Sequence, residues 1–392
     1  MFTKNRKNTF LISAIALIAT IGCKKSFLDV APQGQLSQTE VALNPNAAKD
    51  LVNGVYNTLY FGGFDKTTVG FLWVIATDVA SDDADKGSFD ADFGPAKEID
   101  NFTHTSNNFI FNNIWNGYYA GIARANQAIQ ALNASTFDAT VKNRLLGEVR
   151  FIRGMYYFNL VRFFGGVPLI LKVASATEAN NAEFQTRATK DQVYTAVTED
   201  LQFAVDNLPL KGDANTETGR ANKGAAQAFL AKVYLYQKNY QKAFDLTKDI
   251  ILSGKYSLVG DYSQIFRMSG NNNNESIFEV QTGITANCDA ISPLFTNGQG
   301  ARATRGWDDL GFGLNNPTLD LANAYPAGDA RKNATIIFVN PTVAGGPNPG
   351  TILYDGFRIP TQDSVQNPRY SYKPHEIVTC NGSKDLSQKI FA

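Results

Sequence analysis

The chain has 392 residues, of which 44% are hydrophobic and 18% are charged. This apolar fraction is sufficient for a large folded core and excludes a wholly disordered chain. Basic and acidic residues are balanced at 36 each, so the chain lacks the basic excess that is typical of nucleic-acid-binding proteins. The length allows two or three domains, or one large helical body with long loops.

The N-terminal residues have the features of an export signal. A start with several lysine and arginine residues precedes the apolar run 10–21. This run is shorter than the about 20 residues that span a bilayer, which favours a signal peptide over residues 1–22. The run ends at Gly22-Cys23, which resembles a bacterial lipobox, although Thr20 stands where leucine is usual. We therefore predict that Cys23 is lipidated and begins the mature protein, with several acyl chains giving a stable anchor. The alternative is a free cysteine in an ordinary secreted protein.

The next part of the chain is expected to contain a tether followed by helices. Residues 24–38 are polar and predict an extended tether. Helical periodicity begins near Pro45 and resumes around Trp115. Between these helices, residues 62–113 are predicted to be rich in loops, with one short apolar segment at 71–76.

The most strongly patterned segment is residues 144–164. Its second half is apolar on nearly every face, which indicates a helix that is buried on all sides. Gly165 is expected to end this helix, and Pro168 prevents it from restarting. Three aromatic residues in periodic segments are predicted to be core residues: Trp73, Trp115 and Tyr157.

Further helices are expected to form repeated hairpins. Thr189 and Gln192 have the spacing of a capping box, which predicts a helix over 189–208 that pairs with the buried helix before it. Residues 221–236 and 240–253 form a second pair, with small and aromatic residues at the spacing of a tetratricopeptide repeat. Because such repeats need neighbours, we expect one curved scaffold.

From about residue 254 the helical periodicity fades. Short β-prone runs occur at 276–281 and 334–339, between stretches rich in glycine, asparagine and proline. This half is predicted to consist of long loops laid over the scaffold, where binding residues tend to concentrate. Cys288 and Cys380 lie here, and whether they form a disulfide stays open because the sequence does not give their separation.

Motifs for catalysis or metal binding are weak. His104 and His375 lie far apart without metal-ligand spacing, and both are predicted to be surface residues. We find no metalloprotease, serine-hydrolase or phosphate-loop motif. Asp308 and Asp309 are candidates for a glycosidase carboxylate pair, but adjacent carboxylates are common on surfaces. The acidic stretch 78–92 lacks EF-hand spacing, which favours a solvated loop over a calcium site. No cofactor and no metal site are predicted.

Aromatic and hydrogen-bonding residues in the predicted loops are candidates for a ligand site. Sugars present apolar C–H faces that flat rings can cover, and a rim of hydroxyls that Arg, Asp and Asn can bond. Trp307 is the first candidate because it stands in a glycine-rich stretch without a periodicity that would bury it. The alternative is that these rings anchor their loops to the scaffold. The candidate ligand-binding residues are Trp307, Arg302, Arg305, Asp308, Phe312 and Phe295 in the second half of the chain, and Phe89 and Phe93 in the first.

Several segments together resemble the RagB/SusD (starch-utilisation-system D-like) family of outer-membrane nutrient-binding lipoproteins. Cys23 and the following SFLDVAPQG resemble the family's mature start. Three segments are similar to its helical signatures, in order: IWNGYYAGIARANQAI, EVRFIRGMYYFNLVRFFGGVPLI and KGAAQAFLAKVYLYQKNYQKAFDLTKDII. NNPTLDLANAYPAGDAR resembles a later segment, so the resemblance extends to about Tyr372. Residues 151–168 are the most specific part.

The resemblance implies a mostly α fold. Its scaffold consists of four tetratricopeptide-like helical hairpins, with long irregular loops and a few short strands. The expected organisation is the signal peptide and a single domain over 23–392, with the scaffold mainly in 40–255 and the loop-rich ligand-binding region mainly in 256–392. Family members usually extend further and end in more helices, so the chain is expected to be truncated at its C-terminus.

The resemblance also implies a function without catalysis. It is that of a lipid-anchored protein on the outer membrane, facing the outside of the cell, which binds a nutrient oligosaccharide or polysaccharide. The protein would deliver this glycan to a SusC-like TonB-dependent barrel. An alternative is a tetratricopeptide-type scaffold for a protein or peptide ligand, and an outer-membrane hydrolase is a third hypothesis. Ligand contacts differ among family members, so the candidate site residues rest on the loop argument alone.

Overall fold

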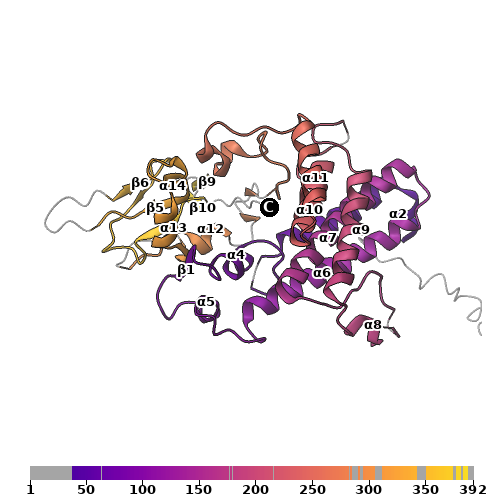
Figure 1. The fold of residues 1–392 in the computed structure, drawn as a ribbon, viewed down its shortest axis with the longest axis horizontal. Helices are drawn as coiled ribbons and strands as arrows, with labels where there is room; N and C mark the ends of the chain where they lie inside the picture. Colours follow the sequence, from indigo (N-terminus) through magenta and orange to yellow (C-terminus); the bar gives the residue numbers. More distant parts are fainter. Residues whose placement is uncertain are drawn as a thin grey trace, which may run out of the picture.

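The computed structural model shows a mostly helical protein with a few short strands. It describes residues 38–62, 64–175, 177–178, 180–214, 216–281, 283–284, 290–291, 295–304, 311–341, 350–373, 377–380 and 383–386. Figure 1 shows long helices on one side of the molecule and the strands with short helices on the other. We call the described residues of 38–60 and 109–252 the helical part, and those of 84–87 and 295–373 the strand-bearing part. Within the described ranges, no helix has the length and apolarity needed to cross a bilayer.

The helical part follows the predicted order of hairpins. Its elements are α2 (Gln38–Leu43), α3 (Pro45–Tyr56), η2 (Asn57–Tyr60), α6 (Phe109–Asn133), α7 (Ala139–Phe164), α8 (Ala182–Gln185), α9 (Lys190–Asn207), α10 (Lys223–Tyr236) and α11 (Tyr240–Leu252). The capping box of Thr189 and Gln192 is present, and Gly165 ends α7 with a φ of 70°. Helix α6 begins before the expected Trp115, because the Asn108 side chain accepts a hydrogen bond from the backbone of Ile110 and caps it there.

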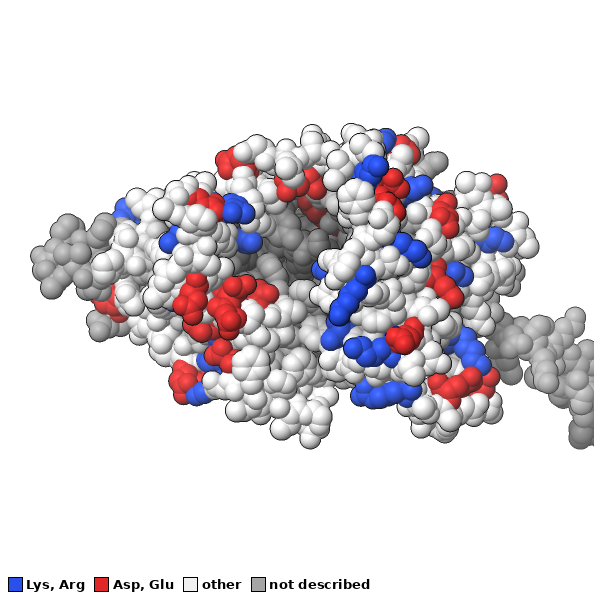
Figure 2. Space-filling view, viewed as in Figure 1, with Lys and Arg blue, Asp and Glu red and all other residues white. Residues whose placement is uncertain are grey.

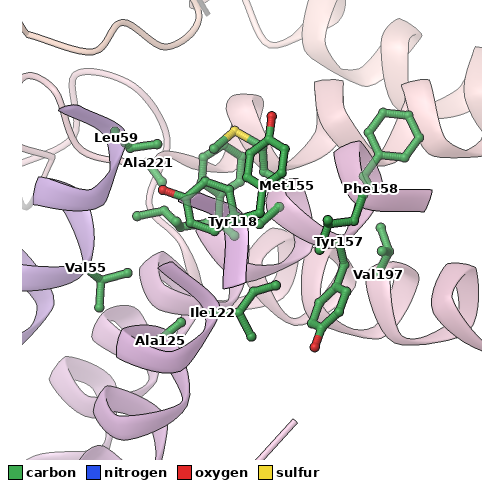
Figure 3. Packing of buried hydrophobic residues seen from close by; sticks show 14 of the residues in the cluster. Val55, Leu59, Tyr118, Ile122, Ala125, Met155, Tyr157, Phe158, Val197 and Ala221 are labelled. Atoms are coloured by element: carbon green, nitrogen blue, oxygen red, sulfur yellow. The ribbon is translucent and has the colours of Figure 1, made fainter. Parts of the chain in front are cut away.

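Helix α7 lies at the centre of the main core. It packs against α3, α6 and α9, while α10 contacts α9 and pairs with α11. Tyr157 is fully buried, as predicted. Figure 3 shows Tyr157 and Phe158 leaving α7 in different directions, which is how one helix fills the core on several sides. Trp73 and Trp115 are half-buried at the margin of this core.

A buried polar cluster joins three helices of this part. Arg153 of α7 donates to both carboxylate oxygens of Asp200 in α9, at 2.7 and 2.8 Å. It also donates to the side-chain oxygen of Asn126 in α6, at 2.7 Å. All three residues are buried, and these hydrogen bonds give their charged and amide groups partners inside the core. This cluster fixes the relative placement of α6, α7 and α9.

The segment between α3 and α6 is less irregular than predicted. It contains α4 (Phe71–Asp78), β1 (Ala84–Gly87) and α5 (Gly94–Asp100). Strand β1 lies within the acidic stretch that was expected to be a solvated loop, and it pairs antiparallel with β4 (Leu314–Pro317). This pairing joins two segments that are far apart in the sequence.

The strand-bearing part has a small core of its own, which corrects the prediction of loops laid over the scaffold. Its members are Ala301, Ile337, Val339, Leu353, Ile359, Val365 and Tyr370. Antiparallel pairs enclose it: β5 (Ile336–Phe338) with β8 (Arg369–Ser371), and β6 (Thr351–Ile352) with β7 (Arg358–Ile359). The short helices α12 (Phe295–Gln299), α13 (Leu319–Ala324) and α14 (Ala330–Thr335) lie in the same part.

The remaining elements are short. They are η3 (Tyr262–Phe266), η4 (Met268–Gly270), and the pairs β2 (Gly283–Ile284) with β3 (Ala290–Ile291) and β9 (Ile377–Cys380) with β10 (Ser383–Leu386). The predicted strand in 334–339 is confirmed as β5, whereas the one in 276–281 is wrong. In that segment Phe278 and Val280 pack into the main helical core, but the segment pairs with no described strand.

Candidate ligand-binding site

The pairing of β1 with β4 brings the two predicted ligand-binding loops together. At their junction, Asn367 accepts a hydrogen bond from the backbone of Ser88 at 3.1 Å and donates to the carbonyl of Gly313 at 2.7 Å. Gly87 has a φ of +71°, and a Cβ atom there would lie 2.4 Å from the Gly313 oxygen. Only glycine fits this conformation and this close approach. The loop after β1 is therefore tied directly to the segment before β4.

A cluster of phenylalanine rings lies around α4. We call Phe64, Phe71, Phe93, Phe109 and Phe312 the phenylalanine cluster. Phe71 is buried, and its ring centroid lies 6.3 Å from that of Phe93 and 6.4 Å from that of Phe312. Phe93 in turn contacts Phe64 at 6.0 Å and Phe109 at 6.4 Å. The outer rings are open to solvent, since Phe64, Phe109 and Phe312 are 46%, 38% and 41% exposed.

Phe93 is held in an unusual backbone conformation. It precedes α5 with a φ of 47°, in the left-handed region that bulky residues rarely adopt. Such a conformation costs on the order of 1–3 kcal/mol and persists only where the surroundings fix it. Phe93 has ring contacts on three sides, with Phe64, Phe71 and Phe109. These contacts keep its ring in place between the buried and the exposed rings.

A polar group lies in the same pair of loops. The guanidinium of Arg302 lies 5.4 Å from the ring centroid of Phe89, and its Nε is 3.5 Å from a carboxylate oxygen of Asp92. Buried Lys86 donates to the carbonyls of Phe89 and Asp92, at 2.7 and 3.0 Å. Burial lowers the pKa of the Lys86 ammonium, and the neighbouring carboxylate of Asp92 opposes this effect. The lysine therefore shapes the loop that presents Phe89.

The small core of the strand-bearing part supports Arg302. The hydroxyl of Tyr370 accepts hydrogen bonds from the backbone N–H groups of Arg302 and Asn367, at 3.3 and 3.0 Å. Tyr370 is itself buried in that core. The small core of the strand-bearing part therefore holds the backbone of both Arg302 and Asn367 in place.

The structure brings together four of the candidate residues as two contacting groups. Phe89 lies against Arg302, and Phe93 and Phe312 both pack on Phe71. Phe295 begins α12 and is half-buried, and α12 packs near Phe71, since a Cβ on Gly298 would meet that ring. Three candidates lie outside the described residues: Arg305, Trp307 and Asp308.

Sequence reasoning missed two exposed members of the cluster, Phe64 and Phe109. Phe64 follows a glycine pair, which is the signal that made Trp307 a candidate, so the same criterion applied to the first loop would have found it. Phe109 is in the first turn of α6, and its exposure follows from the position of the Asn108 cap. No sequence signal distinguishes it from a core residue of that helix.

The arrangement has the chemistry of a recognition surface. Exposed rings offer apolar faces, and Arg302 with Asp92 offers donors and acceptors beside them. Figure 2 shows a hollow on one face between the two parts of the molecule, with acidic residues gathered beside it on the strand-bearing side and basic residues on the helical side. Across the described ranges, we find no group of three or more His, Cys, Asp or Glu residues arranged to hold a metal ion.

Comparison with known sequences identifies related proteins. SusD-like protein P2 of Formosa agariphila is 30% identical over 250 residues, which cover 63% of this chain and 46% of that protein. A SusD-like protein of Bacteroides ovatus is 25% identical over 348 residues, covering 84% of this chain and 60% of that protein. The chain thus spans about half of the length of these curated relatives.

Solved structures share the fold. A laminarin-binding SusD-like protein is 25% identical with a TM-score of 0.68, and the match covers 88% of this chain and 76% of that one. Surface glycan-binding protein A from Bacteroides thetaiotaomicron, solved in complex with laminarihexaose, is 21% identical with a TM-score of 0.69, covering 88% and 75%. At this lower identity the likeness concerns the fold alone.

A family model gives the assignment. The SusD-like model described as "starch-binding associating with outer membrane" matches residues 26–235, more than half of the chain. Its description names a binding activity and not a catalytic one, as expected for a SusD-like protein. The match includes α3, α6, α7, α9 and most of α10, which form the main core. The chain belongs to the SusD-like family of proteins that associate with the outer membrane.

Proposed function

We propose that this protein binds a nutrient glycan at the cell surface through the phenylalanine cluster and the Arg302–Phe89–Asp92 group. The observation that carries the proposal is the convergence of Phe89, Asp92 and Phe93 with Arg302 and Phe312, from two segments that are far apart in sequence and are tied by Asn367. Laminarin oligosaccharides are the first ligands to test, because the solved structures of similar fold include laminarin-binding proteins.

The proposed site combines apolar aromatic rings with hydrogen-bonding groups, and a glycan requires both. Exposed phenylalanine rings can stack on the apolar faces of sugar rings, and such anchors carry most of the affinity when they are partly buried and fixed. Phe312 fits this description, because its ring makes a T-shaped contact with buried Phe71 while 41% of its surface stays exposed. Asp92 is engaged by Ser88 and Arg302, which suits a hydrogen-bonding role at the rim.

The test is Phe312→Ala, with calorimetric titration of laminarihexaose and a panel of other glycans. We expect a loss of about 2 kcal/mol in binding free energy, as for other anchor residues, with little change in melting temperature. Phe244→Ala on α11 is a matched control, because that ring is also exposed but lies outside the cluster. A lower melting temperature with unchanged affinity of the folded protein would instead identify Phe312 as a loop anchor.

Trp307, Arg305 and Asp308 extend the proposed surface from the sequence argument alone. Trp307→Ala is expected to weaken glycan binding while leaving the melting temperature nearly unchanged. Binding of peptides in place of every glycan in the panel would favour the alternative of a tetratricopeptide-type scaffold. Release of products from a glycan would favour a hydrolase.

We further propose that Cys23 carries the lipid anchor and that the bound glycan passes to a SusC-like TonB-dependent barrel. The anchor is supported by the short apolar run that ends in Gly22-Cys23, and the partner by membership of the family. Cys23→Ala should leave the protein unprocessed or release it from the membrane fraction. Normal processing and membrane association of that variant would refute the anchor, and failure to co-purify with a barrel encoded beside it would argue against the partner.

A further inference from the structure

A cavity lies between α3 and the loop that precedes α10, and its lining residues differ from those of the phenylalanine cluster. It has a volume of about 370 Å³. Lys49, Asn53 and Tyr56 line it from α3, where their spacing of three and four residues places them on one face of the helix. Glu217 and Arg220 line it from the opposite loop. Charged and aromatic groups thus meet around one concave space.

Two cations converge on the carboxylate of Glu217. Lys49 donates to one of its oxygens at 2.5 Å, from the α3 side of the cavity. The Nε of Arg220 donates to the other oxygen at 3.1 Å, from the loop side. The hydrogen bond from Lys49 lowers the pKa of the Glu217 carboxyl, so this position favours a negatively charged group.

Arg220 is fixed before any ligand arrives. One terminal nitrogen donates to buried Glu148 at 2.6 Å, and the other donates to the Asn53 side chain at 2.5 Å. Glu148 is itself held by Arg144, at 2.6 Å. The guanidinium also lies 5.4 Å from the ring centroid of Tyr56. Its Nε edge is therefore a pre-oriented donor at the cavity wall, and a pre-oriented donor loses little freedom on binding.

Glu217 is far less constrained than Arg220. Its side chain is 54% exposed and that of its partner Lys49 is 35% exposed. Ion pairs at such exposure contribute little stability, because water screens them and two long side chains must be held in one geometry. A carboxylate from outside can therefore displace Glu217 at small cost and take over both cations.

We propose that this cavity is a second binding site, for a carboxylate-bearing ligand of monosaccharide size, and that Glu217 competes with the ligand's carboxylate for Lys49 and Arg220. The volume is near the lower end of the roughly 300–1,000 Å³ of typical ligand pockets, which suits one sugar ring. The cavity is also lined by an aromatic, a hydroxyl-bearing and an amide side chain, those of Tyr56, Thr218 and Asn53. These side chains suit the apolar face and the hydroxyl groups of a sugar ring. A uronic acid combines a ring, hydroxyls and a carboxylate.

The test is calorimetric titration of the full chain with glucuronate, compared with glucose and acetate. Glucuronate should bind more tightly than either, because only it supplies both ring and carboxylate. Glu217→Gln keeps the shape of the side chain but removes the competing charge, so it should raise the affinity for glucuronate about three- to tenfold. Lys49→Gln should lower it by a similar factor, since it removes one of the two cations.

Glu183→Gln is the matched control for the change in net charge. Glu183 pairs with Lys172 at 3.0 Å, and both side chains are as exposed as that of Glu217. An equal effect of Glu183→Gln and Glu217→Gln would overturn the proposal, because it would reflect net charge alone. So would equal binding of glucose and glucuronate, or no binding of glucuronate by a folded Glu217→Gln variant. None of these outcomes depends on laminarin binding at the phenylalanine cluster, so the two proposals can fail separately.

Discussion

In the helical part, α7 is enclosed by α3, α6 and α9, and its aromatic side chains belong to one large core. In the strand-bearing part, pairs of strands two or three residues long enclose a much smaller set of buried side chains. The proposed ligand contacts lie where the strand-bearing part meets the helical part. This difference indicates that stability resides mainly in the helices, and that the proposed ligand contacts depend on a small unit that can be altered with less risk to the fold.

The largest expected effect is at the polar cluster in the helical part. Arg153→Met would leave Asp200 buried without its bidentate partner, and breaking a buried pair in this way costs roughly 3–5 kcal/mol. Urea unfolding at neutral pH measures this loss. Lys172→Met, which removes two exposed ion pairs, with Glu178 and Glu183, is the control and should change stability much less. A similar small change for Arg153→Met would show that the cluster does not dominate the helical part.

Tyrosine truncation in each core tests the comparison directly. Tyr157→Ala should reduce the free energy of unfolding by about 3–5 kcal/mol, because it empties a fully buried site in the main core. Tyr370→Ala should cost about 3 kcal/mol or less, because the core around it is small. Calorimetry gives both values.

Hydrogen exchange shows where each tyrosine variant opens. In Tyr370→Ala we expect faster exchange in β5 and β8, with α7 and α9 still protected. Glycan affinity should also fall in that variant, because the Tyr370 hydroxyl holds the backbone of Arg302. Equal loss of protection in both parts would mean that they unfold as one unit.

A smaller effect is expected at Lys86, in strand β1 just before the loop that presents Phe89. Lys86→Met removes two hydrogen bonds to the carbonyls of Phe89 and Asp92, with an expected loss of about 1–2 kcal/mol. Because the folded protein lowers the pKa of Lys86, the unfolded chain binds more protons between that lowered value and 10.5. Over this window the wild type should gain stability relative to the variant as pH rises. Urea unfolding of both proteins at several alkaline pH values measures the difference, and a constant difference would contradict the assigned cause.

Periodicity was enough to predict the long helices of the helical part, but not the short helices α2 and α8. Helices α9, α10 and α11 lie where apolar spacing and the Thr189–Gln192 capping box placed them, because each helix is specified by contacts between near neighbours in sequence. Helix α7 ends at Phe164 as predicted but begins at Ala139, before the expected Arg144. The start of α6 was predicted too late, since the Asn108 cap lies before the first residues of the apolar stripe. Local signals therefore account for both the success and this small error.

The strand-bearing part could not be predicted in the same way. The pairing of β1 with β4 joins residues from opposite halves of the chain, and single strands of four residues carry little pattern. The sequence placed Phe89, Phe93, Arg302 and Phe312 in loops, but their grouping follows from that distant pairing. Phe71 was visible only as an apolar residue, although the candidate rings Phe93 and Phe312 both pack on it.

Asn367 links the loop after β1 to the segment before β4, through hydrogen bonds to Ser88 and Gly313. The tie fixes the bases of both loops through the backbone groups of Ser88 and Gly313, and the contacts of Arg302 with Phe89 and Asp92 are a second link between the loops. A library randomised at residues 89–91 and 312 should yield folded variants at high frequency, whereas randomising Gly87 or Asn367 should not. On the proposed function, exchanging a few loop residues on either side of the Asn367 tie should therefore change which sugar is bound while leaving the fold intact.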